Sequence, residues 1–150
     1  AARRIPEAVR HLRKAVEQNA GDPAAWNNLG RALAEQGEVS EAGECFAESV
    51  ALDPCGHAAW NNLATCHEDS GEVDDAIEAW SRAIDLAPTC TTYLLNRALA
   101  LSGRGRDADA LGDLERLVAL EPEMIPMLRD LSPLARLRSD PRFPRGKTDD

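Results

Sequence analysis

The stretch DPAAWNNLGRAL at residues 22–33 has a near copy, CGHAAWNNLA, at residues 55–64, with the two tryptophans 34 positions apart. Small and turn-forming residues recur at the same interval: Ala42, Ala76 and Ala110; Gly37, Gly71 and Gly105; Pro54, Pro88 and Pro122. A repeat of this length is typical of a helical hairpin that buries its apolar face by stacking on further hairpins. The spacing therefore predicts an all-α array of stacked helix-turn-helix units.

Within the first full unit, local signals predict where each helix begins and ends. Asp22 and Pro23 are typical of a helix start, and the apolar stripe that follows ends at Gly37, so we expect a helix over 23–36. A second stripe begins at Val39 and stops before Asp53-Pro54. The second unit repeats this pattern, whereas the third departs from it most, because Arg97 replaces the leucine found at Leu29 and Leu63.

Both ends of the array also have predicted elements. Residues 5–20 resemble the second helix of a further hairpin. After Pro122, the prolines at 126, 133, 141 and 144 allow only short pieces, so we expect 123–138 to be a capping helix kinked near Ser132-Pro133, onto which Phe143 folds back. Residues 146–150 are expected to be a frayed tail. The predicted organisation is a single domain, 1–150, with a half repeat at 5–20, repeats at 23–56, 57–90 and 91–124, and a capping helix with tail at 125–145.

The repeated pattern resembles the tetratricopeptide repeat. It consists of W-x-x-L-G followed by a large residue, then Ala, an aromatic residue or Leu, a small residue and a closing Pro. The matching residues of the first unit are Trp26, Leu29, Gly30, Leu33, Ala42, Phe46, Ser49 and Pro54. Those of the second are Trp60, Leu63, Ala64, His67, Ala76, Trp80, Ala83 and Pro88. The resemblance implies a right-handed α-solenoid that binds proteins, and the end of the chain, 134–143, is similar to a stretch that closes some bacterial arrays.

Charge and composition exclude several classes of partner. The net charge is −9, and residues 23–122 hold eighteen acidic side chains against six basic ones. Such a body repels phosphate backbones, so we expect no nucleic-acid partner. No apolar run is long enough for a membrane span, and the first residues do not resemble a secretory leader. We expect a cytoplasmic protein, although the lack of an initiator methionine leaves an upstream segment open.

The cysteines and histidines do not form a recognisable catalytic or metal-binding pattern. Four cysteines lack paired spacing, so reduced thiols are expected. If 57–69 is one helix, His57 and Cys66 are about 13 Å apart along its axis, too far for one zinc ion. His67 takes the apolar position of Leu33, which favours a packed histidine. We therefore expect no enzyme activity, no cofactor and no metal.

The first helix of each unit is expected to line a concave groove. The candidate peptide-binding residues lie on the helix face away from the Trp-Leu-Gly stripe. They are Asn27, Asn28, Arg31, Asn61, Asn62, Thr65, Leu95, Asn96 and Leu99.

Asn28, Asn62 and Asn96 share one repeat position and predict a ladder of amides. Carboxamides offer both donors and acceptors, which suits the backbone of an extended peptide. A similar ladder lines the repeats of the O-linked N-acetylglucosamine transferases, where it holds peptide main chain. Alternatively, these asparagines hydrogen-bond the neighbouring helix and are structural.

Some relatives instead hold the C-terminal carboxylates of chaperone tails with paired cations. The corresponding positions here are Asn27 and Arg31, then Asn62, then Thr92 and Asn96, of which only Asn62 agrees. Without the cations we do not expect this chain to bind such tails.

The sequence therefore favours an adaptor or scaffold that docks an extended protein segment. One alternative is a self-association module, because Ala8, Leu12 and Ala15 form an apolar face that a preceding helix would normally cover. That alternative predicts a homodimer. Another is a regulatory domain of a larger protein.

Overall fold

The computed structural model describes residues 4–145, whose contacts divide the chain into two compact units, Ala1–Leu86 and Ala87–Asp150. Within residues 4–145 every regular element is a helix, which confirms the predicted all-α class. No helix in this part has the length and apolar content that crossing a membrane requires. The predicted tail at 146–150 lies outside the described residues, and a single domain over 1–150 stays a prediction.

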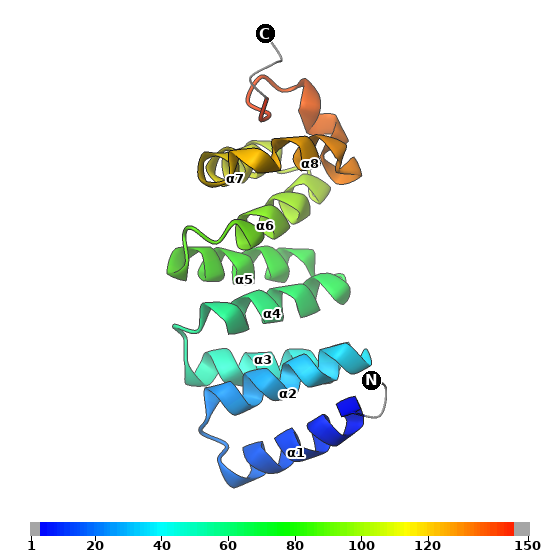
Figure 1. Cartoon of the computed structure of the whole chain (residues 1–150), viewed down its shortest axis with the longest axis vertical. Coiled ribbons are helices and arrows are strands. Elements are labelled where there is room, and N and C mark those ends of the chain that lie inside the picture. The colour runs from blue at the N-terminus through cyan, green and yellow to red at the C-terminus, as the bar shows by residue number, and fades with distance from the viewer. Residues whose placement is uncertain (1–3, 146–150) are drawn as a thin grey trace. The chain divides into compact units, whose positions relative to one another are not determined.

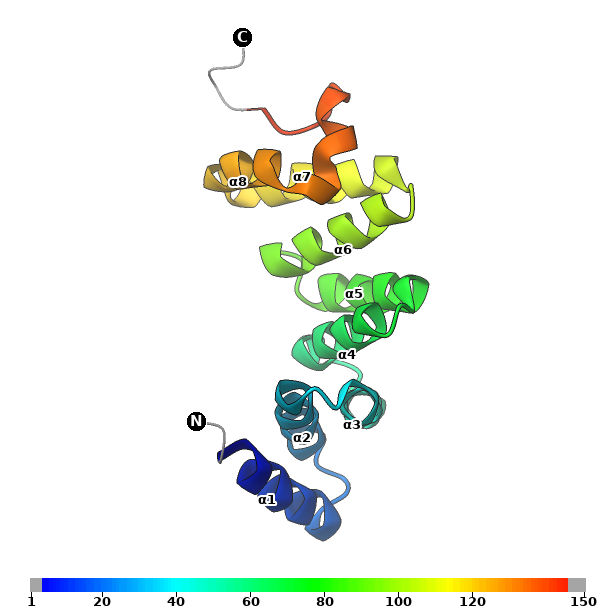
Figure 2. The same ribbon diagram turned by 90° about the vertical axis from the view of Figure 1, so that its right-hand side faces the viewer.

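The first unit is a stack of five helices, each packed on the one before it (Figures 1 and 2). They are α1 (Arg4–Gln18), α2 (Pro23–Gln36), α3 (Val39–Leu52), α4 (His57–Asp69) and α5 (Val73–Leu86). Helices α2 and α3 form one hairpin and α4 and α5 the next, while α1 takes the place of a second helix. These bounds confirm the helices predicted at 23–36 and 57–69.

Turn residues set the ends of these helices. The Asp22 carboxylate accepts a hydrogen bond from the Ala24 amide at 2.9 Å, and Pro23 opens α2 without leaving an unpaired N–H. Gly37 ends the helix with a positive φ of 84°, a conformation that costs glycine little. Gly71 and Gly105 have the same conformation, so the three recurrent glycines serve the same turn.

A close approach between the two helices of a hairpin forms its core. A Cβ atom added to Gly30 would lie 2.7 Å from the ring of Phe46, so only glycine fits opposite this phenylalanine. In the next hairpin Ala64 and Trp80 occupy the same positions, and both are fully buried. The recurrent small residue therefore admits a large ring from the second helix.

The recurrent tryptophans are tied to the connection that precedes their helix. The Trp26 indole donates to the Ala20 carbonyl at 2.8 Å, and the Trp60 indole donates to the Pro54 carbonyl, 34 positions later, at 2.9 Å. Ser49, which stands where the family pattern has alanine, is buried and donates to the Pro23 carbonyl at 2.9 Å. The buried serine hydroxyl thus finds its acceptor in a carbonyl of the first turn of α2.

The second unit contains one hairpin and a C-terminal cap. Its elements are α6 (Thr91–Gly103), α7 (Asp107–Leu120), η1 (Pro122–Met124), α8 (Ile125–Asp130) and η2 (Ser132–Ser139). The short pieces expected from the prolines are present, but the prediction that 123–138 is a capping helix kinked near Pro133 is wrong: η1, α8 and η2 replace it, and the first and last of these are 3₁₀ helices. Pro126 and Pro133 each open one of the later pieces, and neither can donate a backbone hydrogen bond within a longer helix.

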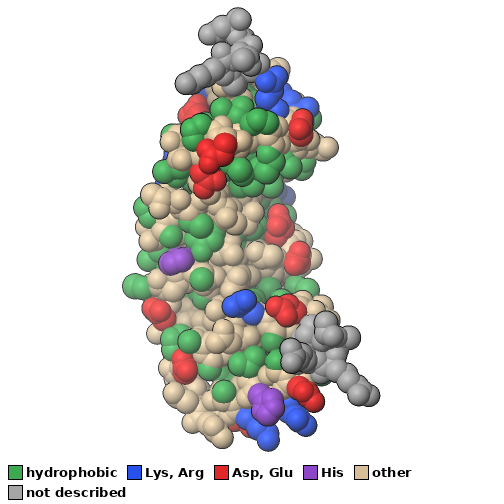
Figure 3. All heavy atoms as spheres, in the orientation of Figure 1, with side chains coloured by type: hydrophobic (Ala, Val, Ile, Leu, Met, Phe, Trp, Pro, Cys, Tyr) green, Lys and Arg blue, Asp and Glu red, His purple; other side chains and the backbone are tan. Residues whose placement is uncertain are grey.

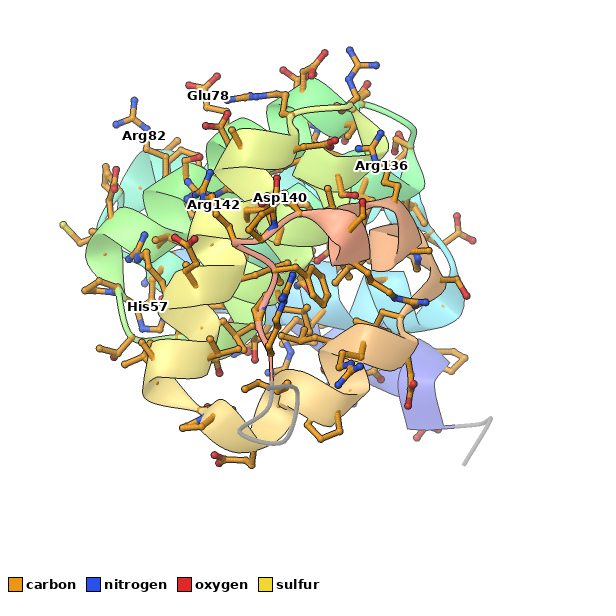
Figure 4. The ribbon with its side chains drawn as sticks, turned by 90° about the horizontal axis from the view of Figure 1, so that it is seen from above. His57, Glu78, Arg82, Arg136, Asp140 and Arg142 are labelled. Atoms are coloured by element: carbon orange, nitrogen blue, oxygen red, sulfur yellow. The ribbon has the colours of Figure 1, made fainter. Side chains whose placement is uncertain are left out.

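Arginines hold the cap on the hairpin of the second unit. Arg136 donates to the Ser102 carbonyl and pairs with Asp107, while Arg142 pairs with Glu115 on α7 at 3.0 Å. Figure 4 shows Arg136 and Arg142 reaching from the cap toward the helices beneath it. Phe143 is buried, as predicted, and with Leu128, Leu134 and Leu137 it gives the cap an apolar core.

The arginine that breaks the leucine pattern of the third hairpin has a buried partner. Arg97 makes two hydrogen bonds to the Asp113 carboxylate, of 2.8 and 2.7 Å, and the Asp113 side chain is only 4% exposed. Asp113 stands where the second hairpin has Ala79, just as Arg97 stands where it has Leu63. The two departures from the repeat pattern therefore compensate each other.

We predict that Asp113→Ala destabilises the protein by about 3–5 kcal/mol, because it leaves the Arg97 charge poorly compensated in a largely buried place. The double variant Arg97→Leu/Asp113→Ala reproduces the Leu63–Ala79 pair and should recover most of this loss. Denaturant unfolding of the wild type, both single variants and the double variant measures the coupling. A double variant less stable than Asp113→Ala alone would contradict the compensation.

Candidate functional site

The first helices of the first unit, α2 and α4, each have a buried stripe and an accessible face. On α2, Leu29 and Leu33 are buried, whereas Asn28 and Arg31 are exposed. On α4, Leu63, Ala64 and Cys66 are buried, Thr65 is exposed, and Asn61 and Asn62 are half-buried. The predicted binding residues of both helices thus lie at or next to accessible surface.

A hydrogen bond between two carboxamides links these helices. Asn62 Nδ2 donates to Asn27 Oδ1 at 2.9 Å, and both side chains are half-buried. Each carboxamide has two N–H donors and an oxygen with two lone pairs. After this bond, the Asn27 amino group and the Asn62 carbonyl still have their hydrogen-bonding capacity for a ligand.

Asn61 has a structural partner. Its Oδ1 accepts a hydrogen bond of 3.1 Å from the indole of the fully buried Trp80. In the preceding hairpin Phe46 takes the tryptophan's place and has no N–H to satisfy, so Asn27, the counterpart of Asn61, accepts from Asn62 instead. The type of ring on the second helix therefore decides what the asparagine on the first helix binds.

The remaining polar candidates of α2 and α4 are more accessible. Asn28 and Arg31 are exposed, and within residues 4–145 neither side chain has a hydrogen-bond or ion-pair partner. Thr65 donates to the Asn61 carbonyl one turn earlier at 3.1 Å. Figure 3 shows acidic side chains scattered on one face of the molecule, with uncharged atoms between them.

In the second unit, the candidates lie on α6. Leu95, Asn96 and Leu99 are all half-buried, next to the buried Tyr93 and Leu94. The helix therefore presents one amide between two partly accessible leucines.

The predicted self-association residues of α1 differ from their repeat counterparts. Ala8 is exposed and Leu12 and Ala15 are half-buried, whereas Ala42 and Phe46 on α3 are buried. Leu12 packs in part against the core of the first unit. The face is therefore partly covered, and its most accessible residue is Ala8.

Sequence reasoning missed the Asn61–Trp80 contact and the partner of Asn62: a bond from Asn62 to the neighbouring helix was one of its two alternatives, but Asn27 was not identified as the acceptor. The first had a signal, because a buried indole N–H needs an acceptor and a tryptophan replaces phenylalanine at position 80. The second had none in the repeat pattern, since it joins different repeat positions of adjacent units, 35 residues apart.

The cysteines of the described residues are free thiols in contrasting surroundings. Burial and the nearby carboxylates of Glu41 and Glu44 raise the pKa of Cys45 to about 11. Burial and Asp69 raise the pKa of Cys66, whereas Cys55 is exposed. Since the thiolate is the reactive form, the two buried thiols are poor nucleophiles.

His67 is half-buried, and its Nδ1 lies 2.6 Å from Glu72 Oε2. This contact fits the prediction of a packed histidine with a satisfied ring. Together with Asp75, these side chains form a group whose potential ligand atoms lie within 4.8 Å of one another. It differs from the His57 and Cys66 pair considered from the sequence, and it includes exposed carboxylates that need no ion.

We predict that iodoacetamide at pH 8 modifies the exposed Cys55 first and Cys45 much more slowly, because Cys45 is buried and its pKa of about 11 keeps it protonated at this pH. Mass spectrometry follows the labelling. Equal native rates at Cys45 and Cys55 would contradict the burial of Cys45.

The free energy of unfolding should fall as the pH rises from about 9 to about 11, since the unfolded Cys45 thiol ionises over that range and the folded one does not.

We predict that Asn61→Ala destabilises the protein by about 1–3 kcal/mol, because the buried Trp80 N–H loses its acceptor. Asn28→Ala, which removes an exposed amide, should change stability by less than about 0.5 kcal/mol. In Trp80→Phe, which copies Phe46, the effect of Asn61→Ala should largely disappear. Denaturant unfolding measures all of these variants, and an unchanged Asn61→Ala effect in Trp80→Phe would refute the indole contact.

Comparisons with known proteins agree with this geometry. Models of the tetratricopeptide repeat match residues 1–56 and 57–90. The structure is similar to a crystal structure of MamA, with 22% identity over 83% of this chain and 73% of that one and a TM-score of 0.79. It is equally similar to MamA from Desulfovibrio magneticus RS-1, with 22% identity, 89% and 76% coverage and a TM-score of 0.79.

A third solved structure, of YrrB, has 15% identity over 94% of this chain and 73% of that one, with a TM-score of 0.80. It is described as a TPR protein with an unusual peptide-binding site. No curated protein sequence matches the chain significantly. The repeat matches, the helix bounds and the structural neighbours confirm the predicted α-solenoid class, and the chain belongs to the tetratricopeptide repeat family.

Proposed function

We propose that the accessible face of α2 and α4 binds an extended segment of a partner protein. Membership of the tetratricopeptide repeat family supports a protein-interaction scaffold in general. The observation that carries the finer proposal is the Asn27–Asn62 hydrogen bond, which holds two carboxamides side by side next to the unpaired amide of Asn28.

The chemistry of these amides suits main chain better than a particular side chain. An extended peptide advances about 3.3 Å per residue and presents N–H and C=O groups along its length. Asn27 has two N–H groups for peptide carbonyls, and Asn62 has a carbonyl for a peptide N–H. Arg31, exposed on the same helix, adds a cation that favours a partner segment with an acidic group nearby.

In the second unit, taken by itself, the candidate residues of α6 hold the same repeat positions as those of α4. Asn96 corresponds to Asn62, and Leu95 and Leu99 correspond to Asn61 and Thr65. Two half-buried leucines favour an apolar side chain of the ligand. The YrrB precedent supports a peptide ligand, since that protein shares the fold and is described as having a peptide-binding site.

The test uses a peptide selected on the wild-type protein from a random display library, with affinity measured by titration calorimetry. Asn28→Ala and Asn62→Ala should each weaken binding by about 1–3 kcal/mol, because ligand backbone groups lose their partners. Gln18→Ala, which removes an exposed amide from α1, serves as the matched control and should leave affinity unchanged.

Thermal melting separates binding from folding. If Asn62→Ala lowers the melting temperature while affinity stays at the wild-type value, the Asn27–Asn62 pair is structural and the proposal is wrong.

Self-association through α1 is a second candidate, favoured by one observation. Ala8 is exposed, whereas its counterparts Ala42 and Ala76 have no exposed surface at all. A second copy packed there would bury this surface.

Light scattering over a range of concentrations tests this candidate with Leu12→Arg. The candidate predicts a wild-type dimer and a monomeric variant. A wild-type protein that stays monomeric at all concentrations would exclude it.

A further inference from the structure

A second surface of the first unit lies apart from the accessible face of α2 and α4. A groove of about 750 Å³ is lined by α1, α2 and α3. Its lining includes Trp26 and Leu29, which belong to the α2 stripe opposite Asn28 and Arg31. A ligand in this groove would therefore contact other residues than a peptide on the asparagines.

The floor of this groove is apolar and offers few hydrogen bonds. The floor is formed by Val16, Leu29 and Cys45 together with the half-buried ring of Trp26. The Trp26 N–H is already bonded to the Ala20 carbonyl. Because the walls are helices, whose backbone groups bond internally, an extended chain would find few partners for its own backbone, whereas a helix satisfies its backbone by itself.

The rim carries strong negative charge. Glu17, Glu41, Glu44 and Glu48 line the groove, and Arg13 is the basic residue among them. Arg13 is paired with Glu41 at 2.7 Å, while the other three carboxylates have no ion-pair partner within residues 4–145. The negative charge of the rim also acts on Cys45 on the floor: burial raises the pKa of this thiol, and Glu41, Glu44 and Glu48 raise it further.

This acidity is not a general property of the repeat. One repeat later, Glu17 is replaced by Ala51 and Glu48 by Arg82, and Asp75 and Glu78 are the carboxylates that remain. Figure 4 shows Glu78 and Arg82 pointing away from the helices beside each other on α5. The equivalent positions thus hold two carboxylates and one arginine, against four and one in the groove.

We propose that this groove binds a short cationic amphipathic helix of a partner protein. Apolar side chains of that helix at i, i+3, i+4 and i+7 occupy the apolar floor shared by α1, α2 and α3, and lysines or arginines flanking the stripe pair with Glu17, Glu44 and Glu48. An acidic helix should not bind, because the same carboxylates would repel its negative charge.

The probe is a fluorescent synthetic helix of about four turns, with leucine at helical spacing on one face and lysine on the other. Fluorescence anisotropy should show saturable binding that weakens with added salt. Peptides with glutamate in place of lysine, or serine in place of leucine, should not bind.

Two pairs of variants locate the probe. Glu44→Lys/Glu48→Lys should weaken binding about tenfold or more, and Glu78→Lys, its control on α5, less than about twofold.

Ala47→Trp adds bulk at an exposed lining residue and should also block binding, whereas Ala51→Trp, on the same helix outside the lining, should not. Circular dichroism melting checks that each variant is folded, and Asn28→Ala should leave binding unchanged.

Three results would overturn the proposal. The first is an absence of saturable binding. The second is an equal loss in Glu78→Lys and in Glu44→Lys/Glu48→Lys, which would indicate unspecific attraction to an acidic protein. The third is a concentration-dependent dimer that Ala47→Trp abolishes, which would make a second copy the occupant.

Discussion

The first two complete hairpins depend on one close approach, in which a large side chain of the second helix lies against a residue with little or no side chain on the first. Glycine at position 30 leaves room for the ring of Phe46, and the same arrangement buries Trp80 completely in the next hairpin. The helices can approach only where the small residue and the large one recur together. The 34-residue period is therefore a packing requirement repeated along the chain, and the turns at Gly37, Gly71 and Gly105 serve it.

This constraint also affects the candidate binding face. Trp80 has an N–H that Phe46 lacks, and burial obliges that N–H to find an acceptor on the first helix, which is Asn61. Where phenylalanine is present, the corresponding Asn27 instead accepts from Asn62 of the next unit. A choice of side chain in the core thus determines which surface amides have unused hydrogen-bonding groups.

Most of the fold could be predicted from the sequence, because turn residues and apolar stripes are local signals. Pro23, Gly37 and the Asp53-Pro54 pair suffice to locate the first hairpin, and the helices follow these limits. The C-terminal cap was harder to predict, since closely spaced prolines indicate that a helix is interrupted but not that the resulting pieces are 3₁₀ helices. The Arg97–Asp113 pair needed a comparison of two departures in one hairpin, which periodicity alone does not reveal.

The sequence predicted which helix faces carry the candidate residues, but not which of their amide groups lack a hydrogen-bond partner within the protein. The sequence places Asn61 and Asn62 equally well on that face, yet one bonds a buried indole and the other a neighbouring amide. No sequence motif indicated the groove lined by α1, α2 and α3, because its carboxylates come from separate helices, and only the packing of these helices brings Glu17 and Glu48 to one rim.

Side-chain amide resonances test the central claim most directly, because the asparagine carboxamides make the proposed contacts and their NH₂ signals respond to a ligand bound at either end of the amide. In a titration with a selected peptide followed by nitrogen–proton correlation spectra, the NH₂ signals of Asn27, Asn28 and Asn62 should shift together and saturate. The signal of Gln18, on α1, should stay in place. Binding that shifts other residues while these three asparagine signals remain fixed would contradict the account.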